Sequence, residues 1–194
     1  MTITHLLYLH GFRSSPQSAK AQQTLAAMRQ HHPDTTCWCP QLPPSPRQAM
    51  DMVAKAIAQW PHHSMAVVGS SLGGFYATWV AEHTGCRAVL LNPAVDPARD
   101  LAAYIGEQTQ WHAPEERFYF LPEYVQELRD LACGPLHDPE RYFCIIAKGD
   151  EVLDWREMHA RYQQCKVQLL EGSNHAITEY ADYLPAVLAH LGGG

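Results

Sequence analysis

Short apolar runs alternate along the chain with longer segments in which apolar residues recur every three or four positions. The short runs predict β-strands and the longer segments predict amphipathic helices. Strands that alternate with helices are typical of βαβ units, so we predict an α/β fold with a mostly parallel sheet of about six strands flanked by about six helices. The predicted strands cover residues 4–9, 35–39, 64–68, 88–91, 142–147 and 166–170. The predicted helices cover residues 16–32, 47–60, 72–83, 155–162 and 178–191, and one more begins near Pro122.

Two helix starts carry local signals. Pro16 suits the first position of a helix, where its missing N–H costs nothing, and Ser15 would then be the N-cap. Asp154 stands directly before the helix predicted over 155–162, so we expect it to cap that helix.

The segment 96–139 is the least regular part of the chain. Four aromatic residues precede the helix that begins near Pro122, namely Trp111, Phe118, Tyr119 and Phe120. Such a segment could form a small cap over a site. We favour the alternative of a crossover helix with a loop whose aromatic side chains pack on the sheet. In either case a chain of 194 residues predicts one domain spanning 1–194.

Composition and charge narrow the classes of partner. The net charge of −6 and the pI near 6.0 give no basic surface for nucleic acid or an anionic membrane. The first residues lack the features of a signal peptide, and no apolar run approaches the ~20 residues that a membrane span requires. We therefore expect a cytoplasmic protein without a membrane span. The six cysteines show no Cys-x-x-Cys pair or zinc spacing, so we expect free thiols and no metal site.

The segment Gly69-Ser70-Ser71-Leu72-Gly73 follows a predicted strand and opens a predicted helix. This context is typical of a nucleophile elbow, which exposes a serine on a strained turn above the sheet edge. The residues two before and two after that serine approach other backbone too closely to carry side chains. Ser71 has glycines at both positions, whereas Ser70 has Val68 and Leu72, so Ser71 is the candidate nucleophile. A phosphate-binding loop would need a Lys-Ser/Thr ending that is absent here, and a turn without chemical importance is the remaining alternative.

The predicted turn also indicates where a negative charge could be stabilised. The N-terminus of the following helix favours negative charge, and the backbone N–H of Leu72 is the expected oxyanion donor. A second donor should come from the loop after the first strand, His10-Gly11-Phe12. We assign it to the N–H of Phe12, with Arg13 as the alternative.

A triad in this fold runs in the order serine, acid, histidine. His175 follows the strand 166–170 directly, whereas His159 and His190 fall inside predicted helices. Asp150 stands at the carboxyl end of the strand 142–147, where it could accept the Nδ1–H of His175. Asp154 remains the alternative acid, and Glu151 should point elsewhere if Asp150 points inward.

These motifs resemble the YqiA-type bacterial esterases, a family of small single-domain α/β hydrolases. The resemblance rests on His10-Gly-Phe-Arg-Ser-Ser-Pro, Pro40-Gln-Leu-Pro-Pro, Val68-Gly-Ser-Ser-Leu-Gly-Gly-Phe-Tyr-Ala-Thr-Trp, Asn92-Pro-Ala-Val, Gly149-Asp-Glu-Val-Leu-Asp and Asn174-His-Ala. It covers nearly the whole chain and is weakest over about 98–140. It implies a serine esterase that acts on acyl esters or acyl thioesters without a cofactor, with Ser71, Asp150 and His175 as its triad.

Two other functions stay open at this point. An acyl-CoA thioesterase would use the same triad but would need a basic surface for the phosphates, for which Lys20, Arg13 and Arg47 are the nearest candidates. A non-catalytic protein-binding module on a hydrolase fold is the other possibility, because fold does not fix function. The acyl-chain preference and the oligomeric state are not predicted by any motif.

Overall fold

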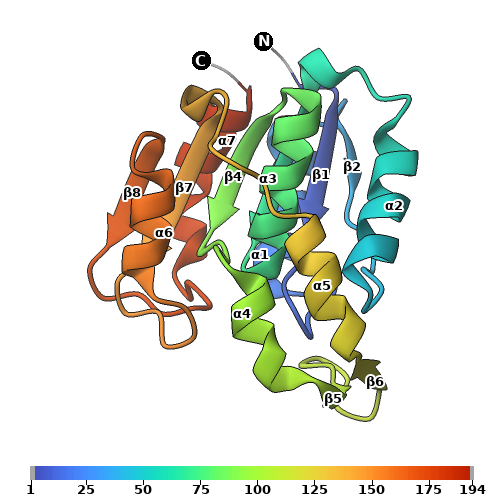
Figure 1. Cartoon of the computed structure of the whole chain (residues 1–194). Helices are drawn as coiled ribbons and strands as arrows, with labels where there is room; N and C mark the ends of the chain where they lie inside the picture. The colour runs from blue at the N-terminus through green and yellow to red at the C-terminus, as the bar shows by residue number, and fades with distance from the viewer. Residues whose placement is uncertain (1–2, 193–194) are drawn as a thin grey trace.

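Six apolar segments form a single parallel sheet in the computed structural model, which describes residues 3–192 (Figure 1). Their order across the sheet is β2-β1-β3-β4-β7-β8. Every residue of β3 and β7 is buried, because helices cover both faces of the sheet, and this explains their almost uninterrupted apolar sequence. The prediction of an α/β fold with a six-stranded parallel sheet is confirmed. The strands span His5–Leu9 (β1), Thr36–Trp38 (β2), Met65–Ser70 (β3), Arg87–Leu91 (β4), Tyr142–Ala147 (β7) and Lys166–Leu170 (β8).

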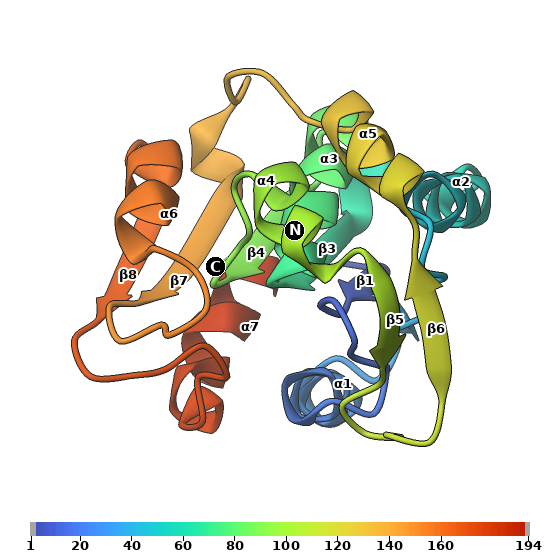
Figure 2. The ribbon, with the colours of Figure 1, turned by 60° about the horizontal axis from the view of Figure 1, so that its bottom comes forward.

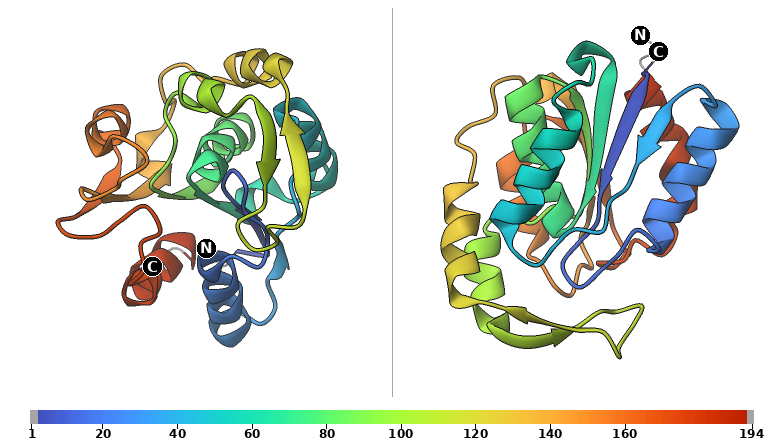
Figure 3. Two further views of the ribbon diagram at one scale, coloured as in Figure 1. Left: turned by 90° about the horizontal axis from the view of Figure 1, so that it is seen from below. Right: turned by 90° about the vertical axis from the view of Figure 1, so that its right-hand side faces the viewer.

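Helices pack on both faces of this sheet (Figures 2 and 3). One face is covered by α2 (Pro46–Ile57), α3 (Leu72–Thr84) and α6 (Trp155–Tyr162), and the other by α1 (Ala19–His31) and α7 (Leu184–Gly192). Successive residues of each strand point to opposite faces, so each strand contributes to both halves of the core. Among residues 3–192, no helix combines the length and apolar character needed to cross a membrane.

Two predicted helix starts are wrong. The first helix begins at Ala19 rather than Pro16, because the Ser15 hydroxyl accepts the N–H of Gln17 in a turn that precedes the helix. The last helix begins at Leu184 rather than Thr178, after a 3-10 turn over Tyr180–Tyr183. The N–H groups of Tyr180 and Asp182 donate to carbonyl oxygens three residues earlier, those of Ile177 and Glu179, so this stretch forms tight turns rather than an α-helix. Other predicted bounds differ from the observed ones by only a few residues.

The segment 96–139 contains a β-hairpin that the sequence pattern did not predict. After α4 (Pro97–Leu101), the strands β5 (Gly106–Thr109) and β6 (Arg117–Phe120) pair in antiparallel register, and α5 (Pro122–Asp130) follows. The hairpin lies at the end of the molecule where the strands of the large sheet terminate (Figures 1 and 3). The predicted helix near Pro122 is therefore confirmed, but the expected loop is a hairpin.

The expectation that the aromatic residues of this segment pack on the sheet holds for only some of them. Trp111 and Tyr119 are exposed, with 64% and 60% of their surface accessible. Phe120 is buried in the core cluster on the face of the sheet that α2 and α3 cover, and Phe118 packs against that cluster. Both rings also pack edge-to-face against Phe12, at ring-centroid distances of 5.9 Å for Phe118 and 5.4 Å for Phe120, so the hairpin contacts the loop after β1.

The six cysteines are all free thiols, as the sequence predicts. Cys86 and Cys144 are buried. Burial raises the pKa of the Cys86 thiol to about 11, so at neutral pH this side chain is protonated and acts as a small apolar residue.

His190 allows a test of how burial sets the pH dependence of stability. Its Nε2–H donates to the carbonyl oxygen of Arg141 at 3.0 Å, and burial lowers its pKa below the ordinary value. As pH falls from about 7 to 5, the unfolded chain takes up this proton before the folded chain does, so the free energy of unfolding should fall. A His190→Gln variant keeps a donor but does not titrate. Its stability should depend less on pH, by up to about 1.4 kcal/mol per pH unit, in urea denaturation at pH 5.5, 6.5 and 7.5.

The control for this prediction is His63→Gln, which replaces an exposed histidine. It should leave the pH dependence of the wild-type protein unchanged. Parallel stability profiles for His190→Gln and the wild-type protein would contradict the prediction.

Candidate active site

The carboxyl ends of the parallel strands bring five loops to one edge of the sheet. In parallel α/β sheets this edge is where ligands bind. The loops after β1, β3, β4, β7 and β8 carry His10–Ser14, Ser71, Asn92, Asp150 and His175 in turn. All the residues that we predicted for the site lie in these loops or directly beside them.

Ser71 occupies a sharp turn between β3 and α3. Its φ of 56° and ψ of −121° lie outside the regions that residues with side chains normally adopt. Its N–H donates to the carbonyl oxygen of Leu91 at 3.0 Å, and its own carbonyl oxygen accepts the N–H groups of Gly74 and Ala94 at 2.8 and 3.0 Å. Ser70, in contrast, is the last residue of β3 and is buried. The strained serine is therefore Ser71, and such strain is concentrated at functional sites.

Glycine at positions 69 and 73 is required by close backbone contacts. A Cβ on Gly69 would lie 2.1 Å from the carbonyl oxygen of Gly73, and a Cβ on Gly73 would lie 2.0 Å from that of Leu9. Both distances are far below van der Waals contact. The expectation that side chains are excluded on both sides of Ser71 is confirmed.

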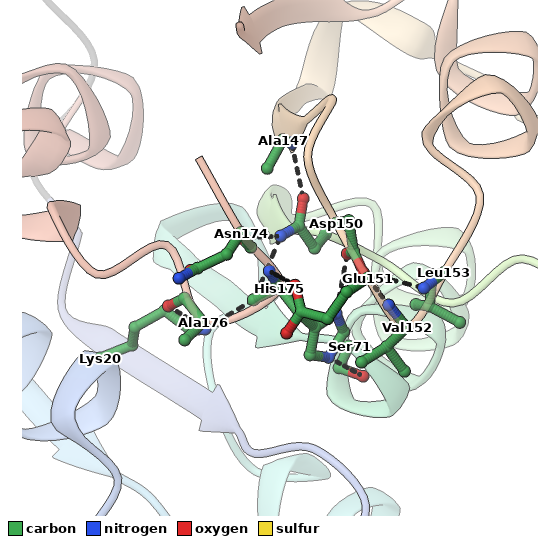
Figure 4. A network of polar contacts seen from close by, with 11 residues as sticks. Lys20, Ser71, Ala147, Asp150, Glu151, Val152, Leu153, Asn174, His175 and Ala176 are labelled. Atoms are coloured by element: carbon green, nitrogen blue, oxygen red, sulfur yellow. Dashed lines mark hydrogen bonds and ion pairs between the residues drawn. The ribbon is translucent and has the colours of Figure 1, made fainter. Parts of the chain in front are cut away.

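The side chains of Ser71, His175 and Asp150 meet at this edge although they come from three different loops (Figure 4). Nδ1 of His175 lies 2.7 Å from Oδ2 of Asp150, and Nε2 of His175 lies 3.1 Å from Oγ of Ser71. A carboxylate only accepts, so Nδ1 carries the proton and Nε2 is left with a lone pair toward the serine hydroxyl.

Asp150 is held in place by its own backbone. Its side chain is fully buried, and Oδ1 accepts the N–H groups of Val152 and Leu153, each at 2.8 Å. These two bonds leave Oδ2 for His175. Asp154 has a different partner: its Oδ1 accepts the N–H of Arg156 at 2.9 Å, which confirms it as the N-cap of α6.

Two further charged side chains hold the loop that carries His175. We expected Glu151 to point away from the site. Instead its Oε2 accepts the backbone N–H of His175 at 3.0 Å. Nζ of Lys20 donates to the carbonyl oxygen of Ala176 at 2.6 Å and lies 3.4 Å from that of His175. Burial lowers the pKa of Lys20 to about 8, against the opposing attraction of Asp150. No local motif indicated either contact.

Asn92 connects three loops of the site through one buried amide. Its Nδ2 donates to the carbonyl oxygens of Asn174 and His175, both at 3.1 Å. Its Oδ1 accepts the N–H of Ala147, the last residue of β7, at 2.8 Å. The side chain is completely buried, and its φ of 43° is one that asparagine tolerates better than most residues. In the sequence, Asn92 follows a predicted strand and opens one of the motifs of the family resemblance, but neither feature indicated this role.

Several backbone N–H groups beside Ser71 have no hydrogen-bond acceptor within residues 3–192. Among them are those of Leu72 and Phe12, the two residues that we predicted as oxyanion donors. The loop after β1 approaches the serine closely, because a Cβ on Gly11 would lie 3.2 Å from the Cβ of Ser71. The N–H of Arg13, the alternative donor, also lacks an acceptor in this part of the chain; Arg13 has a φ of 59°, and its side chain bonds to Thr109.

The site thus combines a hydroxyl, an imidazole oriented by a buried carboxylate, and free backbone N–H groups. Groups of this kind can attack a carbonyl carbon, move a proton and stabilise an oxyanion. Within the part of the chain that the structure describes, no three His, Cys, Asp or Glu side chains are grouped so that they could hold a metal ion.

The fold is shared with solved structures of low sequence identity. Alpha/beta hydrolase domain-containing protein 10 from mouse is 13% identical, with a TM-score of 0.72, and the match covers 96% of this chain and 90% of that one. One of the metagenome-derived lipolytic enzymes LipS and LipT is 18% identical, with a TM-score of 0.69, over 98% and 95% of the two chains. The chain therefore has the α/β-hydrolase fold, as predicted.

Family comparison confirms the resemblance seen in the motifs. A UPF0227 protein of Shewanella oneidensis is 25% identical over 151 residues, which are 74% of this chain and 76% of that protein. The model of the uncharacterised protein family UPF0227 matches residues 5–192, nearly the whole chain. The chain belongs to the family UPF0227.

Proposed function

We propose that the protein is a serine hydrolase that cleaves carboxylic esters through Ser71, His175 and Asp150. The observation that carries the proposal is the position of the His175 ring, with one nitrogen 2.7 Å from the Asp150 carboxylate and the other 3.1 Å from the Ser71 hydroxyl. The proposed nucleophile also lies at the N-terminus of α3, where the helix dipole favours developing negative charge.

In the first half of the proposed reaction, Ser71 forms an acyl-enzyme. Nε2 of His175 takes the hydroxyl proton while Oγ of Ser71 attacks the ester carbonyl carbon. The oxyanion accepts hydrogen bonds from the N–H groups of Leu72 and Phe12, and the Asp150 carboxylate stabilises the imidazolium. His175 then gives its proton to the leaving alcohol as the carbon–oxygen bond breaks.

The second half repeats these steps with water as the nucleophile. Nε2 of His175 removes a proton from the water, whose oxygen attacks the acyl carbon, and the same N–H groups hold the oxyanion. The imidazolium returns the proton to Oγ of Ser71, which releases the carboxylic acid and restores the resting site. Every proton in this cycle passes through His175, and no group outside the chain takes part apart from the substrate and water.

The contacts of three basic residues favour an oxygen ester over an acyl-CoA thioester. Lys20 donates to backbone carbonyls of the His175 loop. Arg13 bonds to Thr109 and stacks 4.2 Å above the Trp111 ring. Arg47 pairs with Asp130 at 3.3 Å, on the outer surface of α2. Each of the cations that we considered for binding phosphates thus already has a partner within the protein.

Two features argue against a binding module without catalytic activity. Ser71 is held in a φ region that costs of order 1–3 kcal/mol, which a passive turn could avoid. Lys20 is partly buried and its pKa is lowered by this burial, in a position where its visible role is to hold the His175 loop. Such costs are understandable where the positions of reacting groups matter.

The role of Ser71 can be tested by substitution and by labelling. Ser71→Ala should lower kcat for p-nitrophenyl acetate by a factor of about 10⁴ or more, since only binding and oxyanion stabilisation remain. A fluorophosphonate should label the wild-type protein at Ser71, located by mass spectrometry of the digested protein. Ser70→Ala is the matched control and should still be labelled. Near-normal turnover by Ser71→Ala would refute the proposal.

The acid can be identified by comparing two isosteric substitutions. Asp150→Asn removes the charge that stabilises the imidazolium and fixes its tautomer, so kcat should fall on the order of 10³- to 10⁴-fold. Asp154→Asn keeps an effective N-cap and should change kcat less than about twofold. Steady-state kinetics on one ester measures both variants. A crippled Asp154→Asn beside an active Asp150→Asn would assign the acid to Asp154.

Asn92 should affect turnover as well as stability. In Asn92→Asp an acceptor replaces the donor that faces the carbonyl oxygens of Asn174 and His175, so the His175 loop should shift. We expect a loss of about 1–3 kcal/mol in unfolding free energy and a fall in kcat of at least about tenfold. Tyr162→Phe is the control, because it removes a buried hydrogen bond to Thr78 that does not involve the His175 loop. It should lower stability and leave kcat near the wild-type value, and equal losses of kcat in both variants would contradict a positioning role for Asn92.

A further inference from the structure

A cavity of about 400 Å³ lies beside the free N–H groups of Leu72 and Phe12. It has the volume of a small-molecule pocket, since such pockets span roughly 300–1,000 Å³. Its walls include Leu72, which follows Ser71 in the sequence, and the loop residues Gly11 and Phe12, of which Gly11 lies close to Ser71 in space. Leu42, Pro43 and Met52 form the opposite part of the wall, and Phe118 of the hairpin completes it.

Two polar residues of this cavity, His10 and Arg13, are engaged with other parts of the protein, and Ser14, Gln41, Tyr76 and Gln110 also line it. Nε2 of His10 accepts the N–H of Leu42 at 3.1 Å, which requires a lone pair on Nε2 and a proton on Nδ1. That Nδ1–H donates to the carbonyl oxygen of Gly11 at 2.9 Å, and burial lowers the pKa of His10, so the ring is neutral at pH 7. The guanidinium of Arg13 donates to Thr109. What these walls offer a ligand is chiefly aliphatic and aromatic surface.

The position of the cavity relative to His175 indicates which half of an ester it would hold. The leaving alcohol must lie near Nε2 of His175, because that nitrogen protonates it. Yet within residues 3–192 nothing from the segment 150–176, which carries both His175 and Asp150, lines this cavity. Its walls come instead from the loop that carries the Phe12 N–H and from the segments packed on that loop. The cavity therefore lies on the oxyanion side of Ser71, away from the leaving group.

We propose that this cavity binds the acyl chain of the substrate and that the protein prefers esters of medium-length fatty acids. The proposal rests on the serine hydrolase function proposed above. A volume of 400 Å³ corresponds to roughly a dozen groups of the size of a water molecule, at about 30 Å³ each. By the same volume argument, an apolar chain of about six to ten carbons would fit within the cavity and bury its surface against the mostly apolar walls.

Phe118 of the hairpin β5–β6 forms one part of the cavity wall, and this wall would restrict the acyl chain of the substrate. Nε of Arg13 donates to the carbonyl oxygen of Thr109 at 2.7 Å, and the N–H of Trp111 donates to the carbonyl oxygen of Arg13 at 2.8 Å. These bonds hold the hairpin against the loop after β1, so that Phe118 packs on Phe12. The wall is thereby connected to the residue whose N–H would bind the oxyanion.

Two series of esters distinguish the acyl side from the alcohol side. In p-nitrophenyl esters of straight-chain acids, kcat/KM should rise by up to about fourfold for each added methylene until the cavity is full, and then fall. In acetate esters of straight-chain alcohols, kcat/KM should change little with length. A flat acyl series, or a rise confined to the alcohol series, would overturn the proposal.

A substitution within the cavity gives the second arm of the test. Met52→Trp places a large ring in the cavity, so kcat/KM for the octanoyl ester should fall at least tenfold relative to that for the acetyl ester. Ala58→Trp adds the same ring at an exposed position at the end of the same helix, six residues from Met52 and so on a different face, and should leave the ratio of the two rates unchanged. If Met52→Trp does not fold, Leu42→Phe reduces the cavity from another segment and should shift the ratio in the same direction.

The outcomes separate this proposal from the proposed function. If the wild-type protein hydrolyses no ester of either series and Ser71 is not labelled by a fluorophosphonate, the hydrolase function itself is wrong. If esters are hydrolysed but Met52→Trp and Leu42→Phe lower the acetyl and octanoyl rates equally, the hydrolase function stands and the acyl pocket is wrong.

Discussion

The close backbone contact at the turn after β3 is the constraint on which the site depends. With no side chain at Gly69 or Gly73, the end of β3, the start of α3 and the end of β1 approach one another at distances that no other residue allows. That approach forces Ser71 into a left-handed conformation, above the carboxyl edge of the sheet. It also leaves the N–H of Leu72, directly after Ser71, without an acceptor within the described chain. The strained conformation of Ser71 and the unpaired N–H of Leu72 thus both follow from the close backbone contacts at Gly69 and Gly73.

The other groups of the site must reach Ser71 from strands on the far side of β4. A parallel sheet brings strand ends to one edge but does not determine the path of the loops that follow them. Asn92, directly after β4, supplies that control, because its amide bonds at once to the end of β7 and to the loop after β8. Asp150 and His175 follow these two attachment points by one to three residues, so one side chain sets both of their positions.

Some features of the fold and of the candidate site could be predicted from the sequence alone, and others could not. The buried strands and the glycines around Ser71 produce local patterns, and Asp150 and His175 follow strands, so all could be predicted from nearby residues. The hairpin β5–β6 could not, because its strands are short and are held by Arg13, nearly a hundred positions earlier in the chain. Asn92, Lys20 and Glu151 act through backbone groups of other loops, and such contacts leave no local pattern. The chemical roles of the site residues stay predictions.

The direction in which Lys20 points is informative about the charge of the site. A buried ammonium bonded directly to the Asp150 carboxylate would neutralise the charge that the proposed mechanism needs opposite the imidazolium. Lys20 instead donates to the carbonyl oxygens of His175 and Ala176, and Asp150 acts on it only at longer range. The carboxylate is then compensated by Val152 and Leu153, whose N–H groups are neutral dipoles, and by His175 itself. In the proposed mechanism, the positive charge that this arrangement lets Asp150 stabilise best is therefore the one that would form on His175 when Ser71 attacks.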